Sequence, residues 1–545
     1  MNPFSSSVTL DEDRVVLPPL PDRPLVYTYY DDTARRDKGT SKSDNEILLT
    51  WKRAWWAHGF RPIILTSAEA MSNPLYRGLH EKGMPAALEF EFHRWLAWGH
   101  MGTGLLSSWH CLPMGSYDDL LLSHLRRGEY EQLTRYEGLG SGLFAGQKEQ
   151  INAALKDALS NVKLGTFKSV YEAINADHFK LEQPTSIAHY DTPTIESKYP
   201  ALAKELVNNP VQGRMALNNL IIAHLHTTWQ NTFSSGIAVL KPLPAHTTAL
   251  IEPSLHLAKL LAECPESILQ SSCPPNRPRC SPCVGTKMRI RTPPAYKNVS
   301  TLYTISTVPH PYTMITLTNQ SDAISVPHIR RHTERDEWIF FVTRDILGMG
   351  RGGPSRVVGL KDAIESENGR HRSLWFTVEQ FPASFNPPPP PPKSPTNEVH
   401  RQPERLAPFP EDWLENLDWH FGFPIPRTTV SHGEAISPVP GPERDHGIAG
   451  VPVEKKKSSD PSPPTAEEAK IEVELLQKAR VTINSKDKSI SQIRNVAEAW
   501  NLADTEIWKF VRAYRARELV ERTMWEEEES AYVGVGSVRG KTRWW

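Results

Sequence analysis

The stretch Glu89–Met114, EFEFHRWLAWGHMGTGLLSSWHCLPM, decides the fold that this sequence predicts. Large apolar residues recur in its first half at intervals close to the about 3.6 residues of a helical turn. They are Phe90, Trp95, Leu96 and Trp98. Two glycines then flank Thr103, and a short apolar run from Leu105 follows them. We therefore predict a helix, a glycine-containing turn and a buried strand over 105–114, in that order.

The segment before this stretch alternates between strand and helix patterns in the way that builds a parallel sheet. The run Leu25–Tyr30, LVYTYY, is rich in aromatic and branched residues, which favours a strand. Ile47–His58 carries apolar residues on one face, as a helix does, and Arg61–Leu65 is a second short apolar run. Strand, helix, strand, helix and strand in succession indicate an α/β protein with a mostly parallel, doubly wound sheet.

Several positions in the opening stretch carry a resemblance to a known enzyme family. Glu91 and Arg94 lie three residues apart and share a face of the predicted helix, and the turn Thr103–Gly104 follows it. This order resembles the centre of GT-A type nucleotide-sugar glycosyltransferases of the capsular-polysaccharide and mannosyltransferase-like group. In that family an acid-x-x-Arg helix precedes a Gly-Gly turn and a strand that ends in Asp-x-Asp. Ser108 and His110 stand where the two aspartates belong, and the resemblance covers roughly residues 24–130.

The resemblance implies a protein that takes a sugar from a nucleotide-sugar donor. In the family the two aspartates hold a divalent cation against the diphosphate of the donor. A hydroxyl and an imidazole lack the charge that Mn or Mg requires. The resemblance therefore implies a degenerate site with weak or lost catalysis, in which Ser108 and His110 lie beside the diphosphate without a metal ion. Glu91 and Arg94 would then brace the strand that carries them.

Two further residue pairs are candidates for contact with the donor. Asp31 and Asp32 follow the first predicted strand, near the place where sheets of this kind bind a nucleoside. Arg330 and Arg331 precede another apolar strand pattern, and their guanidinium groups have the geometry that a diphosphate needs. Each pair has a structural alternative. The aspartates then cap a turn, and the arginines belong to a self-paired, solvated surface.

The cysteines are the second clear signal in the sequence. Four of the five fall close together in a segment whose prolines stiffen the loops between them. They are Cys264, Cys273, Cys280 and Cys283. The closing Cys-x-x-Cys suits a tetrahedral thiolate site for structural zinc, and the absence of a secretory signal favours metal over disulfides. Free thiols are the alternative for these four, and Cys111 is predicted to be a free thiol in the core.

Charge and hydropathy exclude several classes of protein. Lys and Arg total 62 against 63 Asp and Glu, so the net charge of −1 provides no whole-chain basic field for nucleic acid or anionic lipid. The N-terminal segment lacks the layout of a secretory signal or a transit peptide. No apolar run is long enough to span a membrane. We therefore expect a soluble protein of the cytoplasm or another non-secretory compartment.

Composition divides the 545 residues into five segments. In order they are a flexible tail over 1–20, an α/β glycosyltransferase-like domain over 21–262, a Cys-rich segment with an α/β continuation over 263–380, a Pro-rich linker over 381–463 and a helical C-terminal module over 464–545. The linker contains the unbroken run Pro387–Pro392, which forms a stiff polyproline spacer. Such a run also suits a partner protein with an aromatic groove.

The C-terminal module leads to a competing class of function. A helix over Ile490–Trp500, a turn at Asn501 and a further helix from Asp504 towards Trp525 are similar to a helix-turn-helix module. The last helix is basic, through Lys509, Arg512, Arg515 and Arg517, which makes RNA contact a candidate role. A plain packing unit of three helices is the alternative. The competing function for the whole chain is therefore a non-catalytic scaffold that binds a partner protein or RNA.

Overall fold

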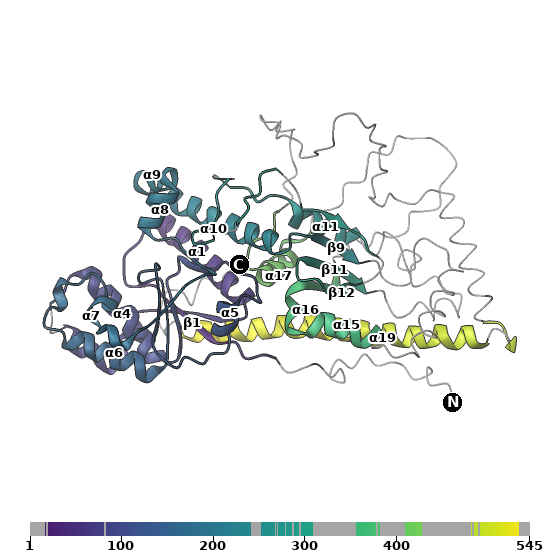
Figure 1. The fold of residues 1–545 in the computed structure, drawn as a ribbon, viewed down its shortest axis with the longest axis horizontal. Coiled ribbons are helices and arrows are strands. Elements are labelled where there is room, and N and C mark those ends of the chain that lie inside the picture. Colours follow the sequence, from purple (N-terminus) through teal and green to yellow (C-terminus); the bar gives the residue numbers. More distant parts are fainter. Residues whose placement is uncertain are drawn as a thin grey trace.

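The computed structural model describes most of residues 20–240, 252–308, 356–381, 409–427 and 484–532, with short gaps inside these ranges (Figure 1). Arg330, Arg331 and Pro387–Pro392 lie outside the described residues, so the roles predicted for them stay predictions. The described part of the chain is a mixed α/β protein in which most strand pairs are parallel. The predicted fold class is confirmed at that level.

The first sheet has six strands in the order β2-β1-β3-β6-β5-β7. They are β1 (Leu25–Tyr29), β2 (Arg61–Leu65), β3 (Gly104–Ser107), β5 (Thr134–Tyr136), β6 (Leu143–Gly146) and β7 (Lys180–Glu182). β1 lies between β2 and β3 and pairs parallel with both, whereas β6 pairs antiparallel with β3 and with β5. The two strands that the sequence predicts before the opening stretch are therefore confirmed.

Helices cover both faces of the first sheet because successive side chains of a strand point to opposite sides. Val26 packs against α1 (Lys38–Ala57) on one face, and Tyr27 packs against α4 (Ala86–Met101) on the other. α4 ends at Gly102, whose φ of 106° is accessible to glycine at little cost. The helix and the glycine turn predicted from the opening stretch thus both form.

A tight turn splits the strand that the sequence predicts over 105–114. Residues 108–110 turn the chain from β3 into β4 (Cys111–Pro113). The carbonyl of Ser108 accepts a hydrogen bond from the backbone N–H of Cys111 at 2.8 Å, which closes the turn. The prediction of one continuous strand is therefore wrong, and Ser108 and His110 belong to a turn.

The second sheet has the order β10-β9-β11-β12, and all its pairs are parallel. Its strands are β9 (Gly236–Leu240), β10 (Ile290–Arg291), β11 (Leu302–Val308) and β12 (Ser373–Thr377). One face packs with α11 (Glu252–Ala262), and the other packs with α15 (Arg356–Glu365) and α19 (Ser491–Tyr532). β9 already pairs in this second sheet, so the chain leaves the first sheet before Gly236, within the segment 21–262 that the sequence predicts as one domain.

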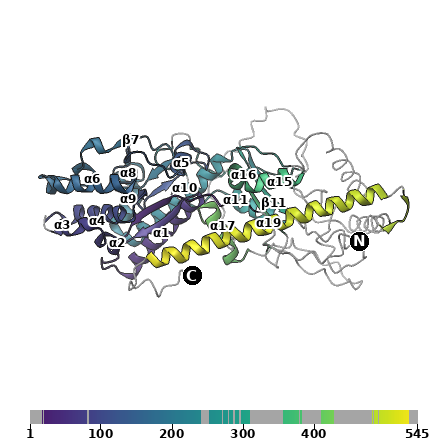
Figure 2. The ribbon, with the colours of Figure 1, turned by 90° about the horizontal axis from the view of Figure 1, so that it is seen from below.

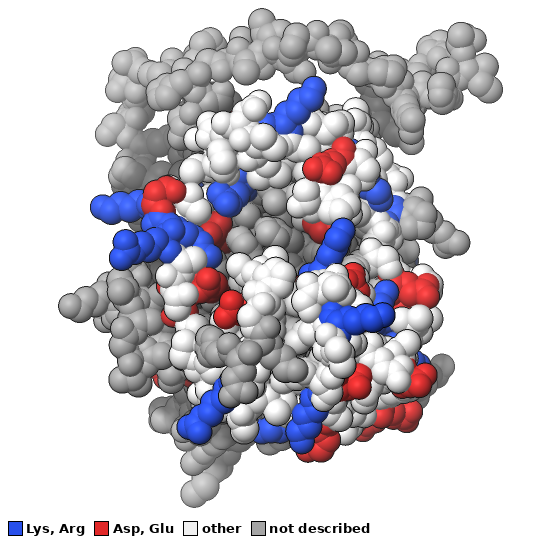
Figure 3. Space-filling view, turned by 90° about the vertical axis from the view of Figure 1, so that its left-hand side faces the viewer, with Lys and Arg blue, Asp and Glu red and all other residues white. Residues whose placement is uncertain are grey.

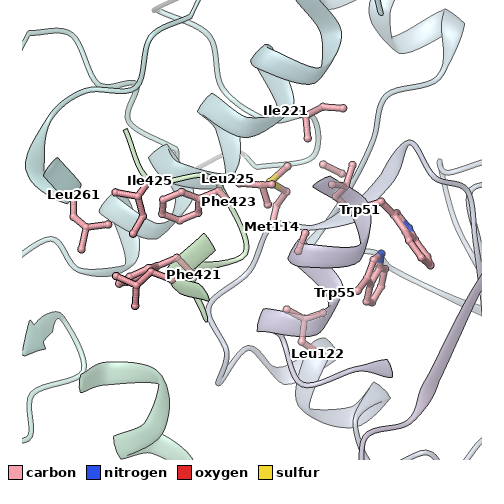
Figure 4. Close-up of a cluster of buried hydrophobic side chains, with 14 of the residues drawn as sticks. Trp51, Trp55, Met114, Leu122, Ile221, Leu225, Leu261, Phe421, Phe423 and Ile425 are labelled. Atoms are coloured by element: carbon pink, nitrogen blue, oxygen red, sulfur yellow. The ribbon is translucent and has the colours of Figure 1, made fainter. Parts of the chain in front are cut away.

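One hydrophobic core joins the two sheets (Figure 4). Trp51 and Trp55 of α1, Leu225 of α10 (Pro210–Thr232) and Phe421 of α17 (Glu411–Phe421) meet in it. Ile237 and Ile305 from the second sheet belong to the same cluster. Although α17 lies within the segment predicted as a Pro-rich linker, it is therefore part of the folded core.

α19 is a single helix of 42 residues that passes along both sheets (Figure 2). Trp508 and Val511 pack against Trp375 of the second sheet, and the Trp525 indole donates a hydrogen bond to the carbonyl of Pro62 at the start of β2, at 3.1 Å. The predicted helix-turn-helix with a turn at Asn501 is therefore wrong. The helix contains neither glycine nor proline, so nothing in its sequence ends it at that point.

The structure also describes eight further α-helices and one further strand. They are α2 (Ser67–Met71), α3 (Arg77–His80), α5 (Leu120–Leu125), α6 (Lys148–Ser160), α7 (Val170–Ala173), β8 (Ile187–His189), α8 (Thr192–Lys198), α9 (Pro200–Asn208) and α16 (Glu367–Arg372). β8 pairs antiparallel with β4. Acidic and basic side chains are interspersed on the face drawn in Figure 3, as the near-zero net charge leads one to expect. Within the described residues, every helix is too short or too polar to cross a bilayer.

Candidate functional site

The turn at residues 108–110 follows the carboxyl end of β3, beside the carboxyl end of the parallel strand β1. The Ser108 backbone N–H donates to the carbonyl of Gly142 at 2.7 Å, which ties the turn to the loop before β6. The Ser108 hydroxyl oxygen accepts a hydrogen bond from the backbone N–H of His110 at 3.3 Å. Ser108 therefore shapes the turn, and its hydroxyl also lies at the edge of the sheet where a ligand is expected.

His110 is the titratable group of this turn. Its ring stacks on Trp109 with 4.2 Å between centroids, and Trp109 meets Tyr30 edge to face at 6.0 Å. Burial lowers the pKa of His110 to about 3, and the nearby His189 and Arg214 act in the same direction. The imidazole is therefore neutral near pH 7. It offers a hydrogen bond to a ligand but no charge.

Glu91 and Arg94 of α4 form an ion pair, and Arg94 contacts the loop before β6. Arg94 is 5% exposed and lies 3.6 Å from the Glu91 carboxylate. Its Nη1 donates to the carbonyl of Ser141 at 2.6 Å, next to the Gly142 carbonyl that holds Ser108. The pair thus supports the loop that positions the turn, and it acts on Ser108 through that loop.

Asp31 and Asp32 lie at the same edge of the first sheet, directly after β1, but local contacts occupy their carboxylates. Asp31 accepts hydrogen bonds from the backbone N–H and the hydroxyl of Thr33, at 3.0 and 2.7 Å. Asp32 accepts one from the Ser67 hydroxyl at 3.0 Å. The Asp31 contacts are those of a turn, which is the structural alternative for the pair, whereas Asp32 bonds to a residue at the start of the helix after β2.

A cluster of charged and aromatic groups beside the turn was missed by the sequence reasoning. Asp44 is buried in α1 between Arg36, at 3.4 Å, and Arg214 of α10, at 3.2 Å. Tyr30 donates to Asp44 at 3.3 Å, and the Arg36 guanidinium lies 4.5 Å from the centre of the Tyr30 ring. Burial raises the pKa of Asp44 although both arginines oppose the shift. The two arginines remain partly exposed, so they can also contact an anion at this edge.

The four clustered cysteines form two disulfides, Cys264–Cys283 and Cys273–Cys280. Their Cα atoms are 5.5 and 6.0 Å apart, the usual range for such bonds. Sulfurs joined in this way are not thiolates and cannot ligate zinc, so the predicted tetrahedral site is replaced by two crosslinks. Among the residues that the structure describes, no three His, Cys, Asp or Glu side chains form a group that could hold a metal ion.

Thiol counting tests this pairing. Unfolding the unreduced protein is expected to expose one reactive thiol of the five cysteines, that of Cys111, because the other four are oxidised. Cys264→Ser is expected to lower the free energy of unfolding by about 3 kcal/mol, since the bond closes a loop between residues 19 apart. Five reactive thiols after unfolding with a chelator, together with zinc released in proportion to the protein, would instead support the metal site.

A cavity of about 740 Å³ lies away from this turn, among the end of α1, β12, α17 and α19. We call it the inter-sheet cavity, and its lining includes Arg23, Trp56, Arg370, His420, Arg515 and Arg522. The residues that line the cavity come from segments several hundred positions apart, so no local sequence pattern predicts that they lie together. The only sequence signal is the basic face of the last helix, which the sequence analysis assigns to RNA.

The family model of DUF8765, a domain of unknown function, matches residues 1–384 and 407–545, and the chain belongs to that family. The matched ranges contain the 108–110 turn as well as the described elements around the inter-sheet cavity. No curated protein and no solved structure matches the chain.

Proposed function

We propose that this member of the DUF8765 family binds a nucleotide sugar at the carboxyl ends of β1 and β3, without a divalent cation. The proposal extends the resemblance to GT-A type glycosyltransferases, and it treats sugar transfer as weak or lost. The observation that carries it is the position of the 108–110 turn, which follows a parallel strand at the edge where open α/β sheets bind their ligands.

The order of the strands supports a ligand at this place. The chain passes from β1 to β2 on one side and then to β3 on the other side of β1. Connections that leave neighbouring parallel strands in opposite directions open a crevice beyond their carboxyl ends. Tyr30 and Asp31 follow β1, and Ser108 to His110 follow β3, at the strand ends where such a crevice is expected.

The side chains at this edge suit a nucleoside diphosphate. Arg36 and Arg214 supply guanidinium groups for the diphosphate, and Trp109 supplies an aromatic ring beside His110. Ser108 and the neutral His110 add hydrogen bonds without charge. Arg330 and Arg331 stay candidates for the same diphosphate.

The same chemistry explains why we propose weak catalysis. Breaking the bond between sugar and diphosphate places negative charge on the leaving phosphate, which metal-dependent transferases neutralise with a cation between two carboxylates. Here the turn offers a hydroxyl and an imidazole, and Asp44 already neutralises part of the charge of Arg36 and Arg214. Less positive charge is therefore left for the leaving group.

Thermal unfolding against a panel of nucleoside diphosphate sugars, with and without Mn, tests the proposal. At least one donor is expected to raise the melting temperature, and Mn is expected to add little. Arg214→Gln should lower the affinity for that donor about tenfold, because hydrogen bonds to charged groups contribute roughly 1.5–3 kcal/mol to binding. Arg127→Gln, at an exposed position of the same sheet domain, is the matched control. The proposal would be overturned if no donor of the panel raised the melting temperature. It would also be overturned if Arg214→Gln and Arg127→Gln lost donor affinity equally.

The second candidate function is a non-catalytic scaffold that has the same fold and binds a partner protein or RNA. The observation that favours it is the absence of a carboxylate from residues 108–110 of the described turn. Donor binding without release of the nucleoside diphosphate over long incubation would mean that transfer is lost, which the first proposal allows. No donor binding together with specific binding of RNA or of a protein partner would select the scaffold instead.

A further inference from the structure

The helix α19 carries large apolar side chains on its solvent side. It runs along the lower edge of the described elements in Figure 1, and Figure 2 views the molecule from that side. Val511 and Trp525 are buried on its inner face. On the outer face Leu519, Val520 and Met524 are 46, 55 and 56% exposed. A surface helix normally presents polar residues to water, so this face has the composition of a contact surface.

Two smaller residues complete an apolar stripe along the outer face. Ala516 and Thr523 are exposed as well. Ala516, Val520 and Thr523 recur at intervals of four and three residues, and Leu519 and Met524 flank them on the same side of the helix. We call these five residues the outer stripe. Ala516 and Leu519 also line the inter-sheet cavity, so the stripe begins beside that cavity. Intervals of four and three residues are those of a helix that packs against a second helix.

The charges before and after the outer stripe have opposite signs. Residues 507–517 contain four basic residues and no acidic one, and residues 526–529 are all glutamate. The basic residues are Lys509, Arg512, Arg515 and Arg517. Several of these groups also form ion pairs within the chain, such as Arg515–Glu518, Arg522–Glu526 and Lys52–Glu529. The charge pattern therefore determines the direction of a partner helix rather than the strength of its binding.

The outer stripe and its flanking charges are self-complementary for two antiparallel copies of the helix. The stripe is centred on Val520, and the basic and acidic groups lie at similar distances on either side of that residue. A two-fold axis at Val520 therefore places the acidic end of each copy beside the basic part of the other. Ala516 of one copy then lies opposite Met524 of the second copy, so that a small side chain faces a large one. A parallel pair would bring like charges together.

We propose that the outer stripe is a dimer interface, in which α19 of a second copy of this chain packs antiparallel around Val520. Burial of the exposed apolar side chains provides the affinity, and the charges select the antiparallel direction. Because the stripe is short, we expect a dissociation constant on the order of micromolar. The interface lies away from the donor edge and does not depend on the function proposed there.

Sedimentation velocity of the full-length protein between about 1 and 200 µM tests the dimer. The weight-average mass is expected to rise with concentration from that of one chain towards that of two. Val520→Glu is expected to raise the dissociation constant at least about tenfold, because it places two carboxylates against each other at the two-fold axis. Val520 is exposed, so this variant is expected to fold. The mass of one chain at every concentration of the unaltered protein overturns the inference.

Val207→Glu is the matched control for Val520→Glu. Val207 is 79% exposed near the end of the helix α9, outside the outer stripe. This variant is expected to change the dissociation constant by less than about twofold, since surface changes away from an interface have small effects. A dimer that both variants weaken equally, or that Val520→Glu leaves intact, uses another surface and overturns the inference.

Reversal of single charges tests the antiparallel direction. Lys509→Glu and Glu527→Lys are each expected to raise the dissociation constant about threefold, and the double variant is expected to regain most of the affinity. The two residues are 18 positions apart on one helix, a distance of about 27 Å, so they interact neither within one chain nor in a parallel pair. In the antiparallel pair they lie close together across the interface. Losses that add up in the double variant overturn the antiparallel arrangement.

Methionine oxidation by hydrogen peroxide tests the interface in the unaltered protein. Met524 in the outer stripe is 56% exposed, and Met71 at the end of the helix α2 is 55% exposed, so the two thioethers start from similar accessibility. Oxidation of Met524 relative to Met71 is expected to fall about threefold or more as the protein concentration rises through the dissociation constant, because the second copy covers Met524. A ratio that is the same at every concentration overturns the inference.

Discussion

Asp418→Ala is expected to lower the free energy of unfolding by about 3 kcal/mol, because it removes the buried carboxylate that Arg53 and Arg427 share and leaves each of them only an exposed glutamate, Glu415 or Glu411. Asp418 is fully buried in α17, and its carboxylate accepts a hydrogen bond from each Nη group of Arg427 at 2.9 Å. Its Oδ2 also lies 3.4 Å from Nη1 of Arg53 in α1. Its Oδ1 accepts a hydrogen bond from the backbone N–H of Ile425 at 2.8 Å. One carboxylate thus holds α17, the segment after it and α1 together. Urea unfolding followed by circular dichroism measures the loss.

Glu411→Ala is the matched control for Asp418→Ala. Glu411 also binds Arg427, at 2.6 Å, but its side chain is 73% exposed. Exposed ion pairs contribute at most about 1 kcal/mol, so the free energy of unfolding of this variant should lie close to that of the unaltered protein. If the two variants lost the same stability, the charge of Asp418 would not be what holds α17 in place.

Gly236→Ala is expected to lower the free energy of unfolding by about 3 kcal/mol or more. Gly236 starts β9 with a φ of 96°, a backbone conformation that costs other residues roughly 1–2 kcal/mol. A Cβ there would come within 2.0 Å of the Arg289 carbonyl oxygen, a backbone atom that cannot rotate away. That oxygen also accepts the N–H of Ile237, so relief of the clash breaks the pairing of β9 with β10.

Gly138→Ala separates the two contributions. Gly138 has a φ of 74°, but no atom lies within 4 Å of the position that a Cβ would take. This variant should lose only the roughly 1–2 kcal/mol of the backbone conformation. Thermal and urea unfolding of the two variants give the difference. If both variants lost the same free energy of unfolding, the contact of the new Cβ with the Arg289 carbonyl oxygen would not destabilise the protein.

The parts of the fold that sequence reasoning predicted are those with local patterns. Arg61–Leu65 is a short apolar run, and the structure makes it β2. The helix before Gly102 forms where its apolar spacing predicts, although residues 94–99 are buried on all sides and Phe90 is 40% exposed, and the glycine ends it. The break at Ser108 was not predicted, because Trp109, Cys111 and Leu112 continue the apolar run through the turn.

Long-range contacts decided what local patterns could not. α19 stays helical past Asn501 because it packs on both sheets, and α17 folds within a proline-rich segment because Asp418 and Phe421 are buried in the core. The zinc prediction used cysteine spacing, and spacing alone does not choose between a metal and paired sulfurs. Arg214, which lies 170 residues from Asp44, has no signal in the sequence near the donor edge.

The continuity of α19 also limits how the two halves can move. Trp508 anchors one part of this rod under the second sheet, and Trp525 anchors another beside Pro62. Because this helix is fixed to both sheets, we expect the described parts of the two halves to separate only if α19 bends or one of its ends detaches. The Trp525 end, fastened by the pairs Lys52–Glu529 and Arg23–Glu521, is the natural place for that release. We therefore expect the local stability of this helix end to limit how far the two sheets can separate.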